Sequence, residues 1–205
     1  GCVGHDFSDA SSEGLAAIAE YQLSQGVTSI CPASMTLSPQ MLRDICGCGR
    51  NYSQRNPSGG SRLVGINLEG PFISNAKRGA QNPDFIRQAD FALLKELQEC
   101  AGGLVKLVTL APETEGAMDF IRQVKDSGLR DISISLGHTQ SDYETTMQAF
   151  ASGADHVTHL FNAMPGFTHR APGVIGAAFD TPGCFAEIIC DGIHIAPSAI
   201  RAAFA

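Results

Sequence analysis

Four short apolar runs in this chain each end in a side chain that can bind a metal or carry a proton. They occupy residues 65–71, 132–139, 156–160 and 188–194. Short continuous apolar runs are typical of strands buried on both faces, as in parallel sheets. The carboxyl ends of parallel strands meet at one edge of the sheet, so polar side chains that follow different strands converge there. The sequence therefore predicts an α/β fold whose functional site is built from strand ends.

Strand-like and helix-like segments alternate along the whole chain. We expect strands at 27–31, 63–69, 104–110, 132–136, 156–160 and 185–190. We expect helices at 11–24, 38–47, 84–100, 114–127 and 141–151, and a last one that starts at Pro197. Thr114 and the box that opens at Ser141 are the expected caps of two of these helices. Loops are expected at 51–61, which is rich in Gly, Pro and Ser, and at 74–82, which is polar and follows a strand end.

This alternation indicates parallel βαβ units, and a closed (β/α)8 barrel needs eight strands. We therefore expect a TIM-type barrel of the metal-dependent hydrolase kind that is incomplete in this chain. Residues 1–205 would form a single partial catalytic barrel domain of about six βα units, with the first and last strands absent. The chain opens without Met in a Gly-rich turn, so we interpret it as an internal piece of a longer protein.

The composition argues against several classes of partner. The formal net charge is -7, so neither a nucleic acid nor a membrane surface is expected as a partner. No apolar run approaches the roughly 18 residues of a membrane helix. The seven cysteines are scattered without a C-x-x-C pair, which favours reduced thiols and a cytoplasmic protein.

Three of the strand-end side chains form a ligand set for a divalent metal. Glu69, His138 and His159 each follow a different predicted strand. One carboxylate and two imidazoles would leave an open position for water, as catalytic metal sites do. His156 precedes His159 by three residues, so the two should face opposite sides of a strand, and we interpret His156 as structural.

Two further residues suggest a role in binding or proton transfer. Arg170 has a planar guanidinium that matches phosphate oxygens. His194, beside Asp191, is a candidate substrate donor or general acid–base. A rival hypothesis is a phosphate-binding aldolase or isomerase barrel, which would need a Schiff-base lysine; Lys106 lies inside a predicted strand.

Six motifs stand in an order that resembles the N-acetylglucosamine-6-phosphate deacetylase family of the amidohydrolase superfamily. They are Leu-Glu-Gly-Pro-Phe at 68–72, Gly-Ala-Gln-Asn-Pro at 79–83, Leu-Gly-His-Thr at 136–139, Thr-His-Leu-Phe-Asn-Ala-Met at 158–164, Arg-Ala-Pro-Gly at 170–173 and Asp-Gly-Ile-His at 191–194. The resemblance covers essentially the whole chain. It implies metal-dependent hydrolysis of N-acetylglucosamine 6-phosphate to glucosamine 6-phosphate and acetate.

The resemblance also implies roles for particular residues. The family's metal ligands fall on Glu69, His138 and His159, with zinc, or alternatively iron, as the metal. Its substrate contacts fall on these positions: Ala80, Gln81, Asn162, Ala163, Arg170 and His194. A small-molecule phosphorylated amino sugar is thus the expected partner, and the full-length protein is expected to be a homo-oligomer, a dimer.

This chain departs from the family pattern in ways that keep alternatives open. Gln81 stands where the family commonly has His, and Ala171 stands where it commonly has Glu. The family's catalytic Asp and the strands of its small β-sandwich are expected to lie outside these residues, the Asp beyond Ala205, with His194 assisting. The alternatives are another amidohydrolase acting on a phosphorylated or N-acylated small molecule, and a catalytically incompetent fragment that binds metal and sugar.

Overall fold

The fold, seen in a computed structural model that describes residues 1–55 and 58–204, alternates strands and helices as the sequence predicts. The strands are β1 (Ser29–Ile30), β2 (Arg62–Leu63), β3 (Ile66–Phe72), β4 (Val105–Leu110), β5 (Ser133–Leu136), β6 (His156–Val157) and β7 (Phe185–Ala186). The α-helices are α1 (Ser12–Ser24), α2 (Pro39–Arg55), α3 (Phe91–Cys100), α4 (Ala117–Lys125), α5 (Tyr143–Ala151), α6 (Gly173–Phe179) and α7 (Pro197–Ala203). Three short 3-10 helices are η1 (Phe7–Asp9), η2 (Asn75–Lys77) and η3 (Pro83–Phe85).

Every strand pair within the described residues is parallel. β1 pairs with β2, and β3 to β7 form a five-stranded sheet in chain order. A parallel bridge between Ala33 and Asn67 joins the two sheets just after β1. The strands thus follow one another in a single direction, which makes the protein an α/β fold with parallel sheets.

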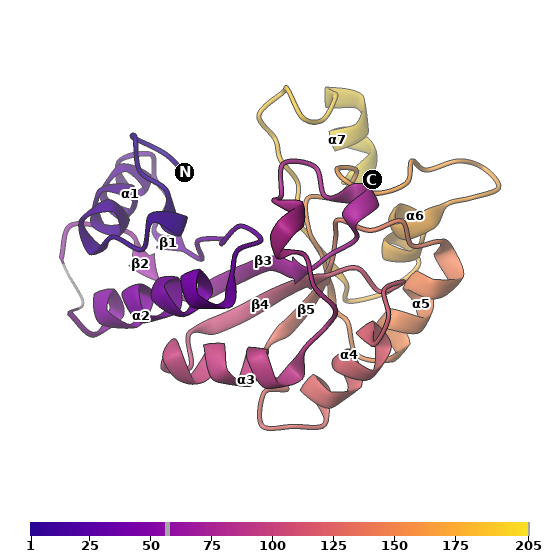
Figure 1. The fold of residues 1–205 in the computed structure, drawn as a ribbon. Helices are drawn as coiled ribbons and strands as arrows, with labels where there is room; N and C mark the ends of the chain where they lie inside the picture. The colour runs from indigo at the N-terminus through magenta and orange to yellow at the C-terminus, as the bar shows by residue number, and fades with distance from the viewer. Residues whose placement is uncertain (56–57, 205) are drawn as a thin grey trace.

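The helices connect successive strands and pack on one another in chain order. α1 contacts α2, α2 contacts α3, and the series continues to α6. Figure 1 shows α2, α3 and α4 lying along the outer side of β3, β4 and β5, with α7 apart from them near the chain end. Because each crossover helix returns the chain to start the next parallel strand, all strands end at the same edge.

Buried apolar side chains form two clusters. The larger lies between β3–β5 and helices α1–α4 and includes Phe72, Leu94, Val108 and Phe120, each at most 1% exposed. The smaller consists of Val157, Leu160, Met164, Val174 and Ile175, around β6 and α6. Strands β3 and β5 are covered over nearly their whole length, whereas both residues of β7 are exposed.

One predicted strand proves to be two. The segment expected at 63–69 is divided near Gly65 into β2, which pairs with β1, and β3, which pairs with β4. A Cβ at Gly65 would lie 2.4 Å from Cγ of Lys106. The backbone therefore passes too close to β4 for a side chain, and the chain changes partners there.

Several helix boundaries also differ from expectation because tertiary contacts decide them. α2 continues to Arg55, so residues 51–55 are helical rather than loop; Tyr52 is buried, 6% exposed, and anchors this extra turn. Residues 56 and 57 of the expected loop lie outside the described residues. α3 starts at Phe91, capped by Asp90, because Pro83 begins a separate 3-10 turn.

The predicted caps of α4 and α5 are wrong by one or more residues. The Thr114 hydroxyl donates to the Ala111 carbonyl, and α4 starts only after Gly116. Asp142, not Ser141, caps α5 by accepting from the Thr145 N–H. The short helix α6 was not predicted, and β6 and β7 span only two residues each.

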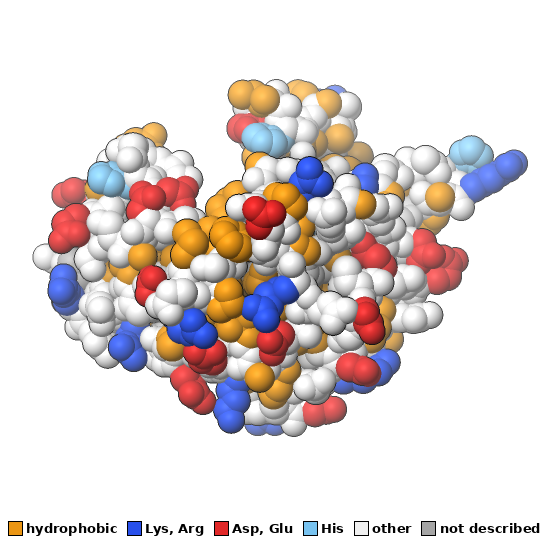
Figure 2. All heavy atoms as spheres, in the orientation of Figure 1, with side chains coloured by type: hydrophobic (Ala, Val, Ile, Leu, Met, Phe, Trp, Pro, Cys, Tyr) orange, Lys and Arg blue, Asp and Glu red, His pale blue; other side chains and the backbone are white. Residues whose placement is uncertain are grey.

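Figure 2 shows acidic and basic side chains interspersed over the face in view. None of the helices within the described residues has the length and apolar character that crossing a membrane would require.

Candidate metal centre

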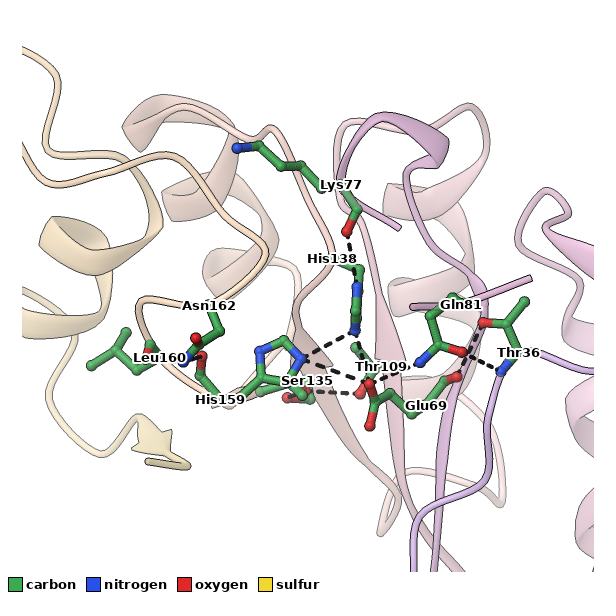
Figure 3. A network of polar contacts seen from close by, with 11 residues as sticks. Thr36, Glu69, Lys77, Gln81, Thr109, Ser135, His138, His159, Leu160 and Asn162 are labelled. Atoms are coloured by element: carbon green, nitrogen blue, oxygen red, sulfur yellow. Dashed lines mark hydrogen bonds and ion pairs between the residues drawn. The ribbon is translucent and has the colours of Figure 1, made fainter. Parts of the chain in front are cut away.

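Glu69 lies within β3, where the strand changes register. It pairs with Thr109 of β4, and the ladder resumes only at Phe72 and Leu110. Gly70, with φ of +93°, and Pro71 form the irregularity between them. Such bulges re-aim a side chain, and here the Glu69 carboxylate points to the edge where β5 and β6 end (Figure 3). The sequence placed Glu69 at a strand end; the structure places it inside the strand, just before the bulge.

His138 follows β5 by two residues and has an unusual backbone. Its φ is +47°, in the left-handed region that non-glycine residues seldom adopt. Gly137 before it has no room for a Cβ, which would lie 2.8 Å from Cβ of Thr158. The turn therefore needs glycine at 137, and it directs the His138 imidazole, 7% exposed, toward Glu69.

His159 repeats this arrangement after the next strand. It follows β6 by two residues and has a φ of +33°. Backbone strain of this kind gathers at functional sites, where the surrounding structure maintains it. The ring of His159 meets that of His138 edge-on, with centroids 4.8 Å apart.

Three side-chain atoms converge at this place. Nε2 of His138 lies 2.8 Å from Oε1 of Glu69, and Nε2 of His159 lies 3.7 Å from the same oxygen. The two Nε2 atoms are 3.1 Å apart. In a tetrahedral zinc site with bonds of about 2.0–2.1 Å, ligand atoms lie about 3.3 Å from one another. The three separations fall around that value.

The donor set itself calls for a cation. Nδ1 of His138 lies 2.9 Å from the carbonyl oxygen of Lys77, which can only accept, so this nitrogen carries a proton. Nε2 then either carries a second proton and donates to the Glu69 carboxylate, or presents a lone pair that needs a cation between it and the carboxylate oxygen 2.8 Å away. A divalent metal is such a cation, so these residues fit one.

The electrostatics of the three side chains are coupled. Burial alone would raise the pKa of Glu69, but hydrogen bonds from His138 and His159 outweigh it and lower that pKa to about 2. Burial would likewise lower the pKa of His159, but its contact with Glu69 raises it above the ordinary value. The site thus holds a carboxylate anion and stabilises positive charge beside it.

The loop 74–82 supports the ligands from one side (Figure 3). The Lys77 carbonyl holds His138, and the Ser74 N–H donates to the His138 carbonyl at 2.9 Å. Gln81 donates through Nε2 to Oε1 of Glu69 at 2.9 Å. The sequence predicted a functional loop here, but it gave no sign that the Lys77 backbone contributes.

Glu113 supports His138 from the other side, and the sequence assigned it no role. Its carboxylate accepts a hydrogen bond from the Thr139 hydroxyl and another from the Gln140 N–H, the latter at 2.7 Å. The Thr139 N–H donates to the Ala163 carbonyl at 3.1 Å. The turn that carries His138 is therefore fixed at both ends. The position of Glu113 just after β4 is the only signal that could have found it.

Three buried hydroxyls lie beside the ligands and were also missed. The hydroxyl of Thr158 lies 2.8 Å from that of Thr109 and 2.6 Å from that of Ser135. All three residues are at most 1% exposed. Their hydrogen bonds join β4, β5 and the start of the His159 turn, which stabilises the spacing of the strands that carry the site.

The structure brings some of the predicted substrate residues near the ligands. Asn162 and Ala163 lie in the turn after His159, and Ala163 has a φ of +50°. Among the described residues, the hydrogen bonds of the Asn162 side chain are long, at 3.4 Å to the His159 carbonyl and 3.5 Å to the Leu160 carbonyl. Ala80 is exposed in the loop beside Gln81, which is itself buried.

Other candidates lie apart from the three ligands. Arg170 is exposed in the segment before α6, which extends outward in Figure 1, and lines a cavity of about 340 Å³ together with Asp142 and Glu144. His194 is about half exposed, and its hydrogen bonds go to Asp191. Lys106 is exposed near the amino end of β4, opposite the edge that carries the ligands, which argues against a Schiff-base role.

Curated proteins with sequences similar to this chain are deacetylases. The chain is 40% identical over 206 residues to the N-acetylglucosamine-6-phosphate deacetylase of Bacillus subtilis (strain 168), and 39% identical to that of Danio rerio. The chain is a homologue of the N-acetylglucosamine-6-phosphate deacetylases. No protein-family model matches it.

Solved structures of these deacetylases share the fold. A mutant deacetylase from Mycobacterium smegmatis, in complex with N-acetyl-D-glucosamine-6-phosphate, superposes with a TM-score of 0.90 at 30% identity. The match covers 98% of this chain and 50% of that one. The chain also covers 51% of the Bacillus deacetylase and 52% of the Danio deacetylase. It thus spans about half the length of the curated relatives it matches.

Proposed function

We propose that this chain is the metal-binding part of a deacetylase that hydrolyses N-acetylglucosamine 6-phosphate to glucosamine 6-phosphate and acetate. The observation that carries the proposal is the convergence of Glu69, His138 and His159 in a chain homologous to such deacetylases. The single carboxylate and two imidazoles are the kind of ligand set that catalytic metal sites use, with a position left for water.

A divalent metal bound there would supply Lewis acidity, which makes water a better nucleophile and polarises an amide carbonyl. Zinc is the proposed metal, because imidazole and carboxylate ligands suit it; iron is the alternative. Glu69 contributes the negative charge, and the Lys77 carbonyl keeps the proton of His138 on Nδ1 so that Nε2 can act as ligand. Within the described residues no fourth carboxylate, histidine or cysteine joins the cluster.

We assign the proton acceptor of the reaction to an Asp outside these residues, with His194 assisting. Asn162, Ala163 and Arg170 are proposed to contact the sugar phosphate, with Ala80 and His194 also on the substrate side. The Mycobacterium smegmatis mutant deacetylase with bound N-acetyl-D-glucosamine-6-phosphate supports this substrate class.

The architecture proposed for the whole protein follows from the parallel sheet. We propose that residues 1–205 form one partial (β/α)8 barrel domain, closed by strands that lie elsewhere in the protein. We also propose that the full-length protein is a cytoplasmic homodimer; the free cysteines among the described residues support the cytoplasmic part of this proposal.

The test compares residues 1–205 with the complete gene product that contains them, both loaded with zinc. We expect the complete protein to release acetate from N-acetylglucosamine 6-phosphate at about 1–1000 per second, as working enzymes do. Residues 1–205 alone should be close to inactive. A zinc-loaded complete protein that releases no acetate would refute the proposed function. Full activity of residues 1–205 alone would refute the assignment of the proton acceptor to an Asp outside these residues.

Arg170→Ala tests the substrate assignment within the complete protein. Loss of a charge-assisted contact worth about 1.5–3 kcal/mol should raise KM for the 6-phosphate by about ten- to a hundredfold. KM for unphosphorylated N-acetylglucosamine should change little. An equal change for both sugars would show that Arg170 does not recognise phosphate.

A further inference from the structure

Gln81 is buried beside the metal ligands, at the end of the loop 74–82. It is only 4% exposed. Figure 3 shows its amide between Glu69 and Thr36, on the side of Glu69 away from His159. A buried amide at this place has to satisfy its hydrogen bonds with the protein around it.

The orientation of the amide is fixed by a backbone donor. The Thr36 N–H donates to Oε1 of Gln81 at 2.6 Å, and a backbone N–H can only donate. Nε2 therefore faces the other way and donates to Oε1 of Glu69 at 2.9 Å. Reversing the amide would place its nitrogen against the Thr36 N–H and its oxygen against the carboxylate, so both bonds would be lost.

The anchor for this amide is itself held against the strand that carries Glu69. The Thr36 hydroxyl donates to the Glu69 carbonyl at 3.3 Å. A Cβ at Gly70 would lie 2.2 Å from that hydroxyl, so Thr36 packs directly on the backbone of β3. Gln81 thus links a fixed backbone point to the movable end of the Glu69 side chain.

We propose that Gln81 is a positioning residue that acts through Glu69, rather than a group that contacts substrate. Every hydrogen bond of the Glu69 carboxylate within the described residues falls on Oε1, which leaves Oε2 unbound there. The amide restrains the rotation of the carboxylate and keeps it aimed at the imidazoles. This inference rests on the proposed metal site.

The test measures zinc affinity directly, by competition with a chromophoric chelator, in the complete protein. Gln81→Met keeps the length of the side chain and its burial but removes both hydrogen bonds. We expect zinc to bind about 10–100-fold more weakly, as is typical when the group that orients a metal ligand is removed. Gln81→Leu should behave alike, which guards against a folding defect in one variant; the melting temperature of each apo-protein is measured alongside.

Gln140→Met is the matched control, because this glutamine is exposed two residues after His138 and its side chain has no hydrogen bond among the described residues. Its zinc affinity should equal that of the wild type. Cobalt substitution gives a second measurement: the visible absorption bands should shift in Gln81→Met and not in Gln140→Met.

The outcomes separate this inference from the function on which it rests. Unchanged zinc affinity and unchanged cobalt bands in both Gln81 variants, with a raised KM for N-acetylglucosamine 6-phosphate, would overturn the positioning role and restore the substrate contact. Failure of the wild type to bind zinc would overturn the metal site and the inference together. Weaker zinc binding at an unchanged apo-protein melting temperature would support it.

Discussion

The two buried clusters differ in how completely they cover their strands, and the metal ligands are divided between them. Glu69 lies within β3 and His138 follows β5, and the apolar side chains of these two strands of the larger cluster are almost fully buried. His159 lies beside the smaller cluster, next to Leu160. Beyond it, strongly exposed apolar side chains lie on β7 and just after α7, namely Phe185 at 70% and Phe204 at 78%.

The difference shows that the site is completed at the junction of the two regions. The region around the larger cluster, from β3 to the turn after β5, carries two ligands and the supports of His138, namely the Lys77 carbonyl and Glu113. The third ligand depends on how the turn after β6 packs against them. Stability should therefore be concentrated in the first region, while metal binding should need both.

The largest effect is expected on the free energy of unfolding, which should differ most between variants of two phenylalanines. Phe120 is 1% exposed and packs on Phe72 with ring centroids 5.2 Å apart. Phe120→Ala should lower the free energy of unfolding by about 3–5 kcal/mol. Phe204→Ala should change it by no more than about 0.5 kcal/mol. Urea unfolding of residues 1–205 measures both, and equal losses would show that the two regions are packed alike.

The next test asks whether the site needs both regions. His138→Ala and His159→Ala should each remove most of the bound zinc, because each deletes one of three protein ligands. His156→Ala is the matched control: this histidine lies near Glu187, with 3.4 Å between Nε2 and Oε1, and is outside the cluster. The zinc bound per protein chain is measured by mass spectrometry. Full zinc stoichiometry in His159→Ala would show that the region around the smaller cluster contributes no metal ligand.

A smaller effect is expected at Glu113, whose carboxylate accepts hydrogen bonds from the turn that carries His138. Glu113→Ala deletes two hydrogen bonds to an exposed carboxylate, and we expect a loss of about 1 kcal/mol in stability or zinc affinity. Glu115→Ala is the control, because the Glu115 carboxylate accepts from the Gln88 side chain and from no other group that the structure describes. Calorimetric titration with zinc measures the affinity. A Glu113 variant indistinguishable from the control would show that the turn holds His138 without this clamp.

The smallest effect is expected at Asp191, in the exposed segment that follows β7. Backbone N–H groups of His194 and Ile193, with the His194 imidazole, lower the pKa of Asp191 to about 2 from its ordinary value of 3.8. A lowered carboxyl pKa stabilises the turn at pH above about 4, and this contribution is lost as the pH falls toward 2. The carbon chemical shift of the Asp191 carboxyl, followed by NMR, should titrate with that midpoint. A midpoint near 4 would mean that the turn does not form in solution.

The sequence by itself determined the alternation of strands and helices and the identity of the metal-type side chains. Apolar runs that end in Glu69, His138 and His159 specify parallel strands and the edge at which they meet, because strand direction follows from the crossover helices. The same local patterns placed the start of α7 at Pro197 and the first residues of α1 within one position.

Only the tertiary structure decided how those side chains are held. The bulge after Glu69 and the left-handed backbone at both histidines depend on how neighbouring strands pack. The hydrogen bonds that Gln81, Lys77 and Glu113 make join residues far apart in the chain, and no local pattern encodes their distances. The same holds for the split at Gly65 and the extension of α2 to Arg55, since close approach and burial set them. Periodicity reports which face of an element is apolar, but the contacts that orient a catalytic side chain arise only when distant segments meet.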